Sequence, residues 1–138
     1  MFLLSIVTPE KVFFEAEIKS LVVPGTEGYL GVLSNHAPLI TGLIPGRVEF
    51  RDADDKVNLM AVSGGFLEVS NNKASILAEA VERADEIDIE RAQAAYEREK
   101  NRLISAGKGE TDIDLPSARA AVERARNRIK VYKEGSGS

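Results

Sequence analysis

Residues 74–106 read ASILAEAVERADEIDIERAQAAYEREKNRLISA, and the local pattern changes within this stretch. Up to Ala80 the residues are typical of a short strand, with Ile and Leu between small and polar side chains. From Asp88 to Ala106 there is no Gly or Pro, and Ala, Glu, Arg and Lys dominate, which is the composition of a helix. A strand-forming part therefore ends near Ala84 and a helical part follows it.

The part before Ala84 contains several short runs rich in Val, Ile, Leu and Phe, separated by Pro, Gly, Asn and Asp. Many short strands with regular turn signals predict a β-sandwich or barrel. Asn71-Asn72 predicts a hairpin turn, because Asn tolerates positive φ. The predicted strands are Phe2 to Val7, Lys11 to Val23, Arg47 to Arg51, Val57 to Val62, Phe66 to Val69 and Ala74 to Ala80.

The part after Ala84 predicts two helices. Asp88 is placed to cap the first, with Ile87 before it as a hydrophobic staple, and Gly107 ends it. Asp114, preceded by Ile113, repeats the same start for a second helix. Two helices joined by a short connection predict an antiparallel hairpin. The fold class is therefore α+β, with a sandwich domain at 1–84, a helical hairpin domain at 87–134 and a Gly-Ser linker at 135–138.

The apolar seam between the helices is thin. Alanine buries little apolar area at roughly 25 cal/mol per Å², so a hairpin of this length should be marginally stable alone. Both a static hairpin and one that opens fit this pattern. The second helix presents Leu115, Ala118, Val122, Ala125, Ile129 and Tyr132; the first presents Ile89, Ala92, Tyr96 and Leu103, with Glu99 interrupting.

The composition excludes several classes of protein. The net charge of -4 argues against a nucleic-acid partner, and the absence of Cys excludes a disulfide framework or a thiolate metal site. With His36 alone, no site needing two imidazoles is expected. No apolar run reaches the roughly 18 residues of a membrane span, and the N-terminus lacks a signal-peptide pattern, so we expect a soluble chain without direct membrane insertion.

Three motifs carry a resemblance to a known family. Residues 25–39 read GTEGYLGVLSNHAPL, residues 62–69 read VSGGFLEV and residues 87–92 read IDIERA. In this order they resemble the epsilon subunit of bacterial F-type ATP synthases, over residues 2–133. The resemblance implies a sandwich of about ten strands followed by the helical hairpin.

The resemblance also implies a function and partners. The chain would be a non-catalytic subunit of the central stalk that couples the gamma subunit to the c-ring in a proton-transporting rotary ATP synthase. Its hairpin would extend toward the catalytic alpha/beta head and restrain ATP hydrolysis. The implied location is the cytoplasmic face of the bacterial plasma membrane, as a peripheral protein. The alternative is a stand-alone ATP-binding sensor or adaptor, which would not copurify with gamma.

The arginines of the hairpin allow two interpretations. Charged residues on a helix are usually a solvated face, whereas guanidinium groups also suit phosphate oxygens. The resemblance implies a regulatory ATP site and no other cofactor. Ser117 stands where nucleotide-binding relatives place another Arg. The residues that match the family's nucleotide motif or binding face are Glu82, Ile87, Asp88, Arg91, Ala92, Arg98, Arg102, Arg124 and Arg128.

The 25–39 segment supplies the candidate partner interface, and no catalytic or metal-binding residues are expected. By resemblance, Glu27 and Tyr29 lie on an edge that faces the c-ring, and His36 is a structural or interface residue rather than a catalyst. The three glycines 25, 28 and 31 lack the Gly-Lys-Ser or Gly-Lys-Thr ending of a phosphate loop, so turn glycines are expected.

Overall fold

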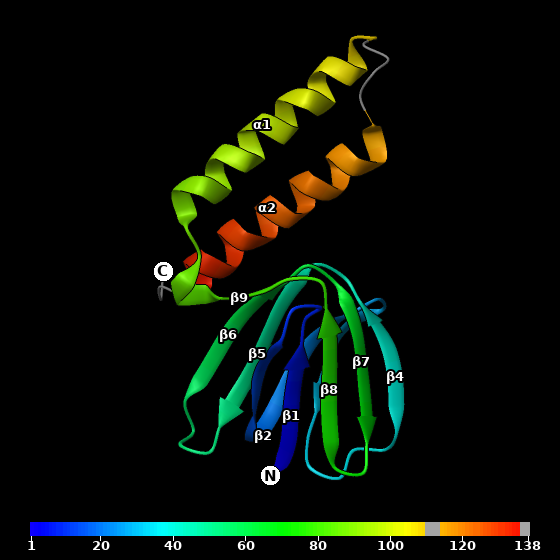
Figure 1. Ribbon diagram of the computed structural model, residues 1–138, viewed down its shortest axis with the longest axis vertical. Helices are drawn as coiled ribbons and strands as arrows, with labels where there is room; N and C mark the ends of the chain where they lie inside the picture. The colour runs from blue at the N-terminus through cyan, green and yellow to red at the C-terminus, as the bar shows by residue number, and fades with distance from the viewer. Residues whose placement is uncertain (110–113, 136–138) are drawn as a thin grey trace. The chain divides into compact units, whose positions relative to one another are not determined.

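The computed structural model describes residues 1–109 and 114–135. The chain divides into two compact units, Met1–Arg83 and Ala84–Ser138. The first is a β-sandwich and the second a helical hairpin (Figure 1). The expected α+β class is thus confirmed.

The described residues of the first unit form one hydrogen-bonded sheet of nine strands, against about ten expected, folded over into a sandwich. The strand order is β1-β8-β7-β4-β2-β5-β6-β9, and β3 pairs with β2 off this path. The strands are β1 (Phe2–Val7), β2 (Val12–Gly25), β3 (Gly28–Val32), β4 (Leu39–Leu43), β5 (Gly46–Asp52), β6 (Val57–Val62), β7 (Gly65–Ser70), β8 (Lys73–Ala78) and β9 (Val81–Arg83).

Strand β2 connects the parts of the sandwich. Its 14 residues pair antiparallel with β1 from Val12 to Ile18, with β5 from Ile18 to Val22, and with β3 from Leu21 to Gly25. Single-residue contact with β4 at Gly25 and Leu43 continues the sheet toward β7 and β8. One long strand is therefore hydrogen-bonded to β1 in its first part and to β5, β3 and β4 in its second part.

The core lies between the layers and is built from alternate residues of the strands. Leu4, Ile6, Ile18, Val23 and Met60 are all 0% exposed. This alternation follows from the period of two in a strand, which sends successive side chains to opposite faces.

The turn between β7 and β8 confirms the hairpin prediction. Asn71 and Asn72 have φ of 51° and 57°, the two positive values that a type I′ turn requires. The Asn72 side chain also accepts a hydrogen bond from Asn35 N at 2.7 Å and donates one to Met1 O at 3.0 Å. The turn thus fixes the start of β1 and the connection between β3 and β4 at the same end of the sandwich.

The second unit contains a short 3-10 helix η1 (Ala84–Glu86) and helices α1 (Ile89–Gly107) and α2 (Leu115–Gly135). Asp88 caps α1 by accepting a hydrogen bond from Arg91 N at 3.1 Å, and Asp114 caps α2 by accepting one from Ser117 N at 3.2 Å. Both predicted caps are confirmed. Ile113, expected before the second cap, lies outside the described residues.

Helix α2 continues one residue further than predicted. The sequence predicts a linker at 135–138, but Gly135 is the last residue of α2, and residues 136–138 lie outside the described part. Gly135 packs on η1, where an added Cβ would lie 2.6 Å from Ala84 Cβ. The absence of a side chain lets the helix end approach η1 this closely, which composition alone did not indicate.

The seam of the hairpin follows part of the predicted face. Ala92, Ala118, Val122 and Ala125 are buried, whereas Leu115 is 39% exposed. The buried side chains are thus mostly alanines, as the pattern predicted. Val131, which lies outside the predicted seam, is also buried.

Candidate interaction and nucleotide sites

Apolar side chains gather on the outer face of β4, β7 and β8. Ile40, Phe66 and Leu77 are 72%, 61% and 54% exposed. Phe66 is directly opposite Leu77, and it lies diagonally to Ile40, since β7 pairs Phe66 with Gly42 and Glu68 with Ile40. We call Ile40, Phe66 and Leu77 the β4–β8 face. Contiguous exposed apolar surface of this kind marks sites of protein association.

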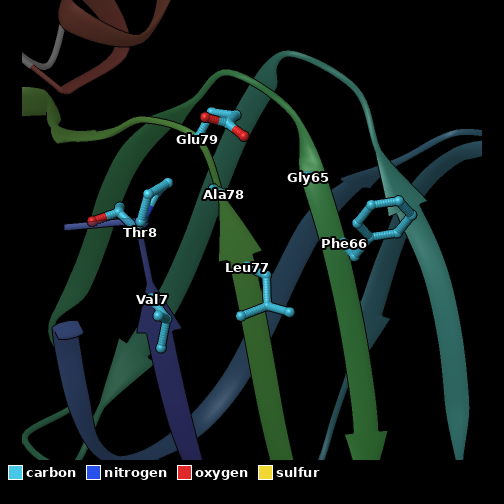
Figure 2. Close-up of a pocket in the computed structure, with 8 residues that line it drawn as sticks. Val7, Thr8, Gly65, Phe66, Leu77, Ala78 and Glu79 are labelled. Carbon is cyan, nitrogen blue, oxygen red and sulfur yellow. The ribbon is translucent and has the colours of Figure 1, made fainter. Parts of the chain in front are cut away.

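An open groove borders this face at one end of β8 (Figure 2). It has a volume of about 380 Å³ and a mostly apolar lining. Figure 2 shows Leu77 between Val7 of β1 and Phe66 of β7, with Glu79 beyond the end of β8. The groove is suited to an apolar side chain of a partner, with Glu79 available to a neighbouring cation. Its lining is Val7, Thr8, Pro9, Gly65, Phe66, Leu77, Ala78 and Glu79.

Glu27 and Tyr29 lie at the turn between β2 and β3. Glu27 is exposed, and the Tyr29 ring is 55% exposed. The Tyr29 hydroxyl accepts a hydrogen bond from Arg47 N at 3.3 Å, and the Arg47 guanidinium lies 5.6 Å from the ring centroid. Tyr29 therefore presents an oriented aromatic surface with a polar tip, which suits a wet interface.

His36 lies at the other end of the same strands. It is half-buried in the connection between β3 and β4, next to Asn35, which is bonded to the Asn72 turn. Its Nδ1 donates a hydrogen bond to the carbonyl oxygen of Ala37 at 2.7 Å. The structure therefore does not bring His36 together with Glu27 and Tyr29, and the three residues form two separate places on the sandwich.

The glycines of residues 25–31 belong to a strand-turn-strand element. Gly25 pairs with Gly28, leaving two residues in the turn, and Gly28 has φ of +125°. A phosphate loop needs a helix after the turn, so that its amide groups point at the phosphates. The strand β3 follows instead. Gly25 and Gly28 flank the turn as predicted, whereas Gly31 lies within β3, paired with Val22, so the turn prediction is wrong for Gly31.

Most of the motif at 87–92 has a structural role at the start of α1. Ile87 is 5% exposed, and Ala92 is fully buried and donates its amide hydrogen to the backbone oxygen of Asp88 at 3.0 Å. The Asp88 side chain holds the cap. Arg91 is different, because the cap uses only its backbone N–H and its side chain is exposed. Arg91 is thus the motif residue whose side chain is available to a ligand.

The remaining arginines have different surroundings. Arg102 donates to Glu99 Oε2 at 2.8 Å, and Arg98 donates to Glu99 Oε1 at 3.5 Å. Arg124 is exposed and Arg128 half-buried on α2, one turn apart. Glu82 lies on β9, paired with Ala61, and so belongs to the sandwich unit rather than to the hairpin. Sequence spacing predicted the shared helix faces but missed Glu99 as the partner of two arginines.

The acidic turn between β5 and β6 has a structural explanation. The Asp52 carboxylate accepts hydrogen bonds from Lys56 N at 3.0 Å and Asp54 N at 2.9 Å, and from Asn58 Nδ2 at 3.2 Å. The Lys56 amide contributes most to holding the pKa of Asp52 below its ordinary value. Asp55 pairs with Lys19 at 3.0 Å. In the described ranges, no three His, Cys, Asp or Glu residues are grouped to hold a metal ion.

These features define a class of protein: a sandwich with an exposed apolar face, joined to a helical hairpin whose seam is mostly alanine. Residues 1–84 match the family described as ATP synthase, delta/epsilon chain, beta-sandwich domain, and residues 85–133 match the long alpha-helix domain of the same chain. The chain belongs to the ATP synthase delta/epsilon chain family. The family expected from the three motifs is thereby confirmed.

Individual relatives agree with this assignment. The ATP synthase epsilon chain of Desulforamulus reducens is 51% identical, with 75% of this chain and 78% of the relative covered. The epsilon chain of Synechocystis is 43% identical, with 76% of each chain covered. A chain in the cryo-EM structure of the mitochondrial ATP synthase of Euglena gracilis has a TM-score of 0.80 at 20% identity, covering 99% of this chain and 81% of that chain. That likeness shows the fold.

Among the helices the structure describes, none is both long and apolar enough to cross a bilayer.

Proposed function

We propose that this chain is the epsilon subunit of the central stalk of a proton-transporting F-type ATP synthase and couples the gamma subunit to the c-ring. It acts at the cytoplasmic face of the bacterial plasma membrane as a peripheral part of the complex. The family assignment over residues 1–133 carries this proposal. As a subunit of this family, it contributes no active site of its own.

The surfaces of the sandwich suit two partners. The β4–β8 face is apolar and bordered by a groove, which suits a stable contact with gamma. Tyr29 and Glu27 form a smaller, more polar place, which suits the polar loops of the c-ring. The two places are neighbours, because Thr26 of the β2–β3 turn donates its amide hydrogen to the backbone oxygen of Gly42, the pairing partner of Phe66.

The hairpin supplies regulation in this proposal. Its alanine seam buries little area, so α1 and α2 separate at low cost and reach the catalytic alpha/beta head. Exposed basic groups on α2 then attract this helix to an acidic surface of the head, and the bound helix restrains ATP hydrolysis. These groups include Arg119, Arg126, Lys130 and Lys133.

Truncation after Arg83 tests the division of labour. The sandwich unit is compact by itself and holds the β4–β8 face, so the truncated chain should still copurify with gamma and the catalytic subunits. ATP hydrolysis by the assembled enzyme should rise, because the inhibitory helices are gone. A full-length chain that fails to copurify with gamma would instead favour the stand-alone ATP-binding sensor.

A regulatory ATP molecule bound by the hairpin would stabilise its closed form. A site made from groups of both helices exists only while they lie together, so the ligand favours that state by linkage. Arg91, with its exposed side chain at the start of α1, is the first candidate for a phosphate contact.

Replacing Arg91 with Ala should weaken ATP binding to the isolated chain by about tenfold or more, the effect of losing a charge-assisted hydrogen bond. The helix cap should survive, because Asp88 bonds the backbone N–H of Arg91. Calorimetric titration with ATP gives the affinity, and Arg119→Ala is the control, an exposed arginine outside the motif. Equal affinities in wild type and Arg91→Ala would remove Arg91 from the site.

A further inference from the structure

Glu99 is a carboxylate buried in the middle of the hairpin seam. It is 8% exposed and lies on the same face of α1 as the fully buried Ala92. Tyr96, one turn before it, contacts α2, since the Arg126 guanidinium lies 5.9 Å from the Tyr96 ring centroid. Leu103, one turn after it, is half-buried. Glu99 therefore occupies a position of the seam that the pattern of α1 would give to an apolar residue.

The carboxylate is paired within its own helix. In the described part of the chain, both of its side-chain hydrogen bonds come from α1, from Arg102 at 2.8 Å and from Arg98 at 3.5 Å. Those two arginine side chains are 44% and 65% exposed, so their charges remain largely in water. The ion pair needs only the turn of α1 on which all three residues lie.

Closure of the hairpin therefore affects Glu99 in one direction. When α1 meets α2, the carboxylate loses water, and it gains no bond from α2 in return. When the helices separate, the pair with Arg102 persists and the carboxylate is hydrated again. Removing a charge from water is unfavourable unless new partners compensate for the lost hydration. The burial of Glu99 thus opposes the association of the two helices.

We propose that Glu99 is the residue that sets how readily this hairpin opens. The rest of the seam offers little resistance to opening, because three of its five buried apolar residues are alanines, Ala92, Ala118 and Ala125, and the other two are Val122 and Val131. A weak apolar seam with one opposing charge lies close to balance between closed and open forms. Small changes in binding energy from a ligand or a partner then shift it.

Replacing Glu99 with Leu in the full chain tests this role. Leu fills the same seam position without a charge, so amide hydrogen exchange in α1 and α2 should slow by about tenfold or more. The chain has no Cys, so Ala94→Cys and Lys130→Cys can carry a pair of spin labels that report the closed fraction directly. That fraction should rise. Glu97→Leu is the matched control, an exposed Glu on the same helix, and should change exchange by less than about twofold.

Arg102→Ala provides an independent arm. Removing the closer partner leaves the buried carboxylate less compensated, so exchange in the hairpin should accelerate by about tenfold. In a Glu99→Leu background the same change should have little effect. The proposal is overturned if amide exchange in Glu99→Leu is as fast as in wild type or faster, or if this variant does not form the hairpin. It is also overturned if Arg102→Ala has the same effect in both backgrounds. All measurements use the isolated full chain and do not depend on the proposed role in the stalk.

Discussion

Gly65→Ala should destabilise the sandwich far more than a substitution at its surface does. Gly65 begins β7 with φ of +141°, a conformation that L side chains rarely adopt. An added Cβ would overlap the backbone oxygen of Leu77 and lie 2.9 Å from Ala78 Cα. Backbone strain and a clash with the partner strand together should lower the free energy of unfolding by about 3 kcal/mol or more. Urea denaturation of the full chain measures this loss.

Gly31→Ala is the control for this prediction. Gly31 also lies in a strand, but an added Cβ would meet no atom within 4 Å. The unfolding free energy should therefore change by no more than about 0.5 kcal/mol. Similar losses in the two variants would show that the close approach of β7 to β8 at Gly65 does not limit stability.

Phe66→Asp should abolish most of the affinity for gamma while leaving the fold intact. Phe66 is 61% exposed at the centre of the β4–β8 face, so removing its ring costs the isolated chain little. In a complex the same ring would be a buried aromatic anchor, and a carboxylate in its place would be desolvated. The dissociation constant for gamma should rise about 30-fold or more, the effect of losing a hot spot of at least 2 kcal/mol.

Val57→Asp separates this effect from a general one. Val57 is 45% exposed on β6, outside the β4–β8 face. Its replacement should leave the affinity for gamma within about twofold of wild type. Titration calorimetry with purified gamma gives both constants. Unchanged binding by Phe66→Asp, with a normal unfolding curve, would place the gamma contact on another surface.

Sequence patterns predicted the elements that follow simple rules. The Asn71-Asn72 turn and the Asp88 and Asp114 caps depend on local backbone chemistry, which neighbouring residues determine. Strands β3, β4 and β9 were not predicted from the pattern of apolar residues. β3 and β4 contain Gly31 and Gly42, which weaken strand propensity, and β9 has 3 residues; their pairing partners supply what the local sequence lacks.

The sites were predictable to a smaller extent, because they depend on contacts between distant segments. Spacing showed that Arg98 and Arg102 share a face, but only the folded hairpin shows the buried Glu99 between them. The exposure of Phe66 and Leu77 was also not predicted from the sequence, since both residues look like ordinary core positions of strands. Register decides which face they occupy, and a shift by one residue would bury them.

The pairing of β2 has a mechanical consequence for the proposed role in a rotary complex. Force applied to the β4–β8 face passes through the ladder of β8 and β1 into β2, and from β2 into β5. A force directed along the strands would load each of these rows of backbone hydrogen bonds in shear, so that several bonds share the load. Two layers joined only by apolar contacts would slide over each other under a smaller load. A torque on this domain therefore meets a continuous, stiff path through the backbone.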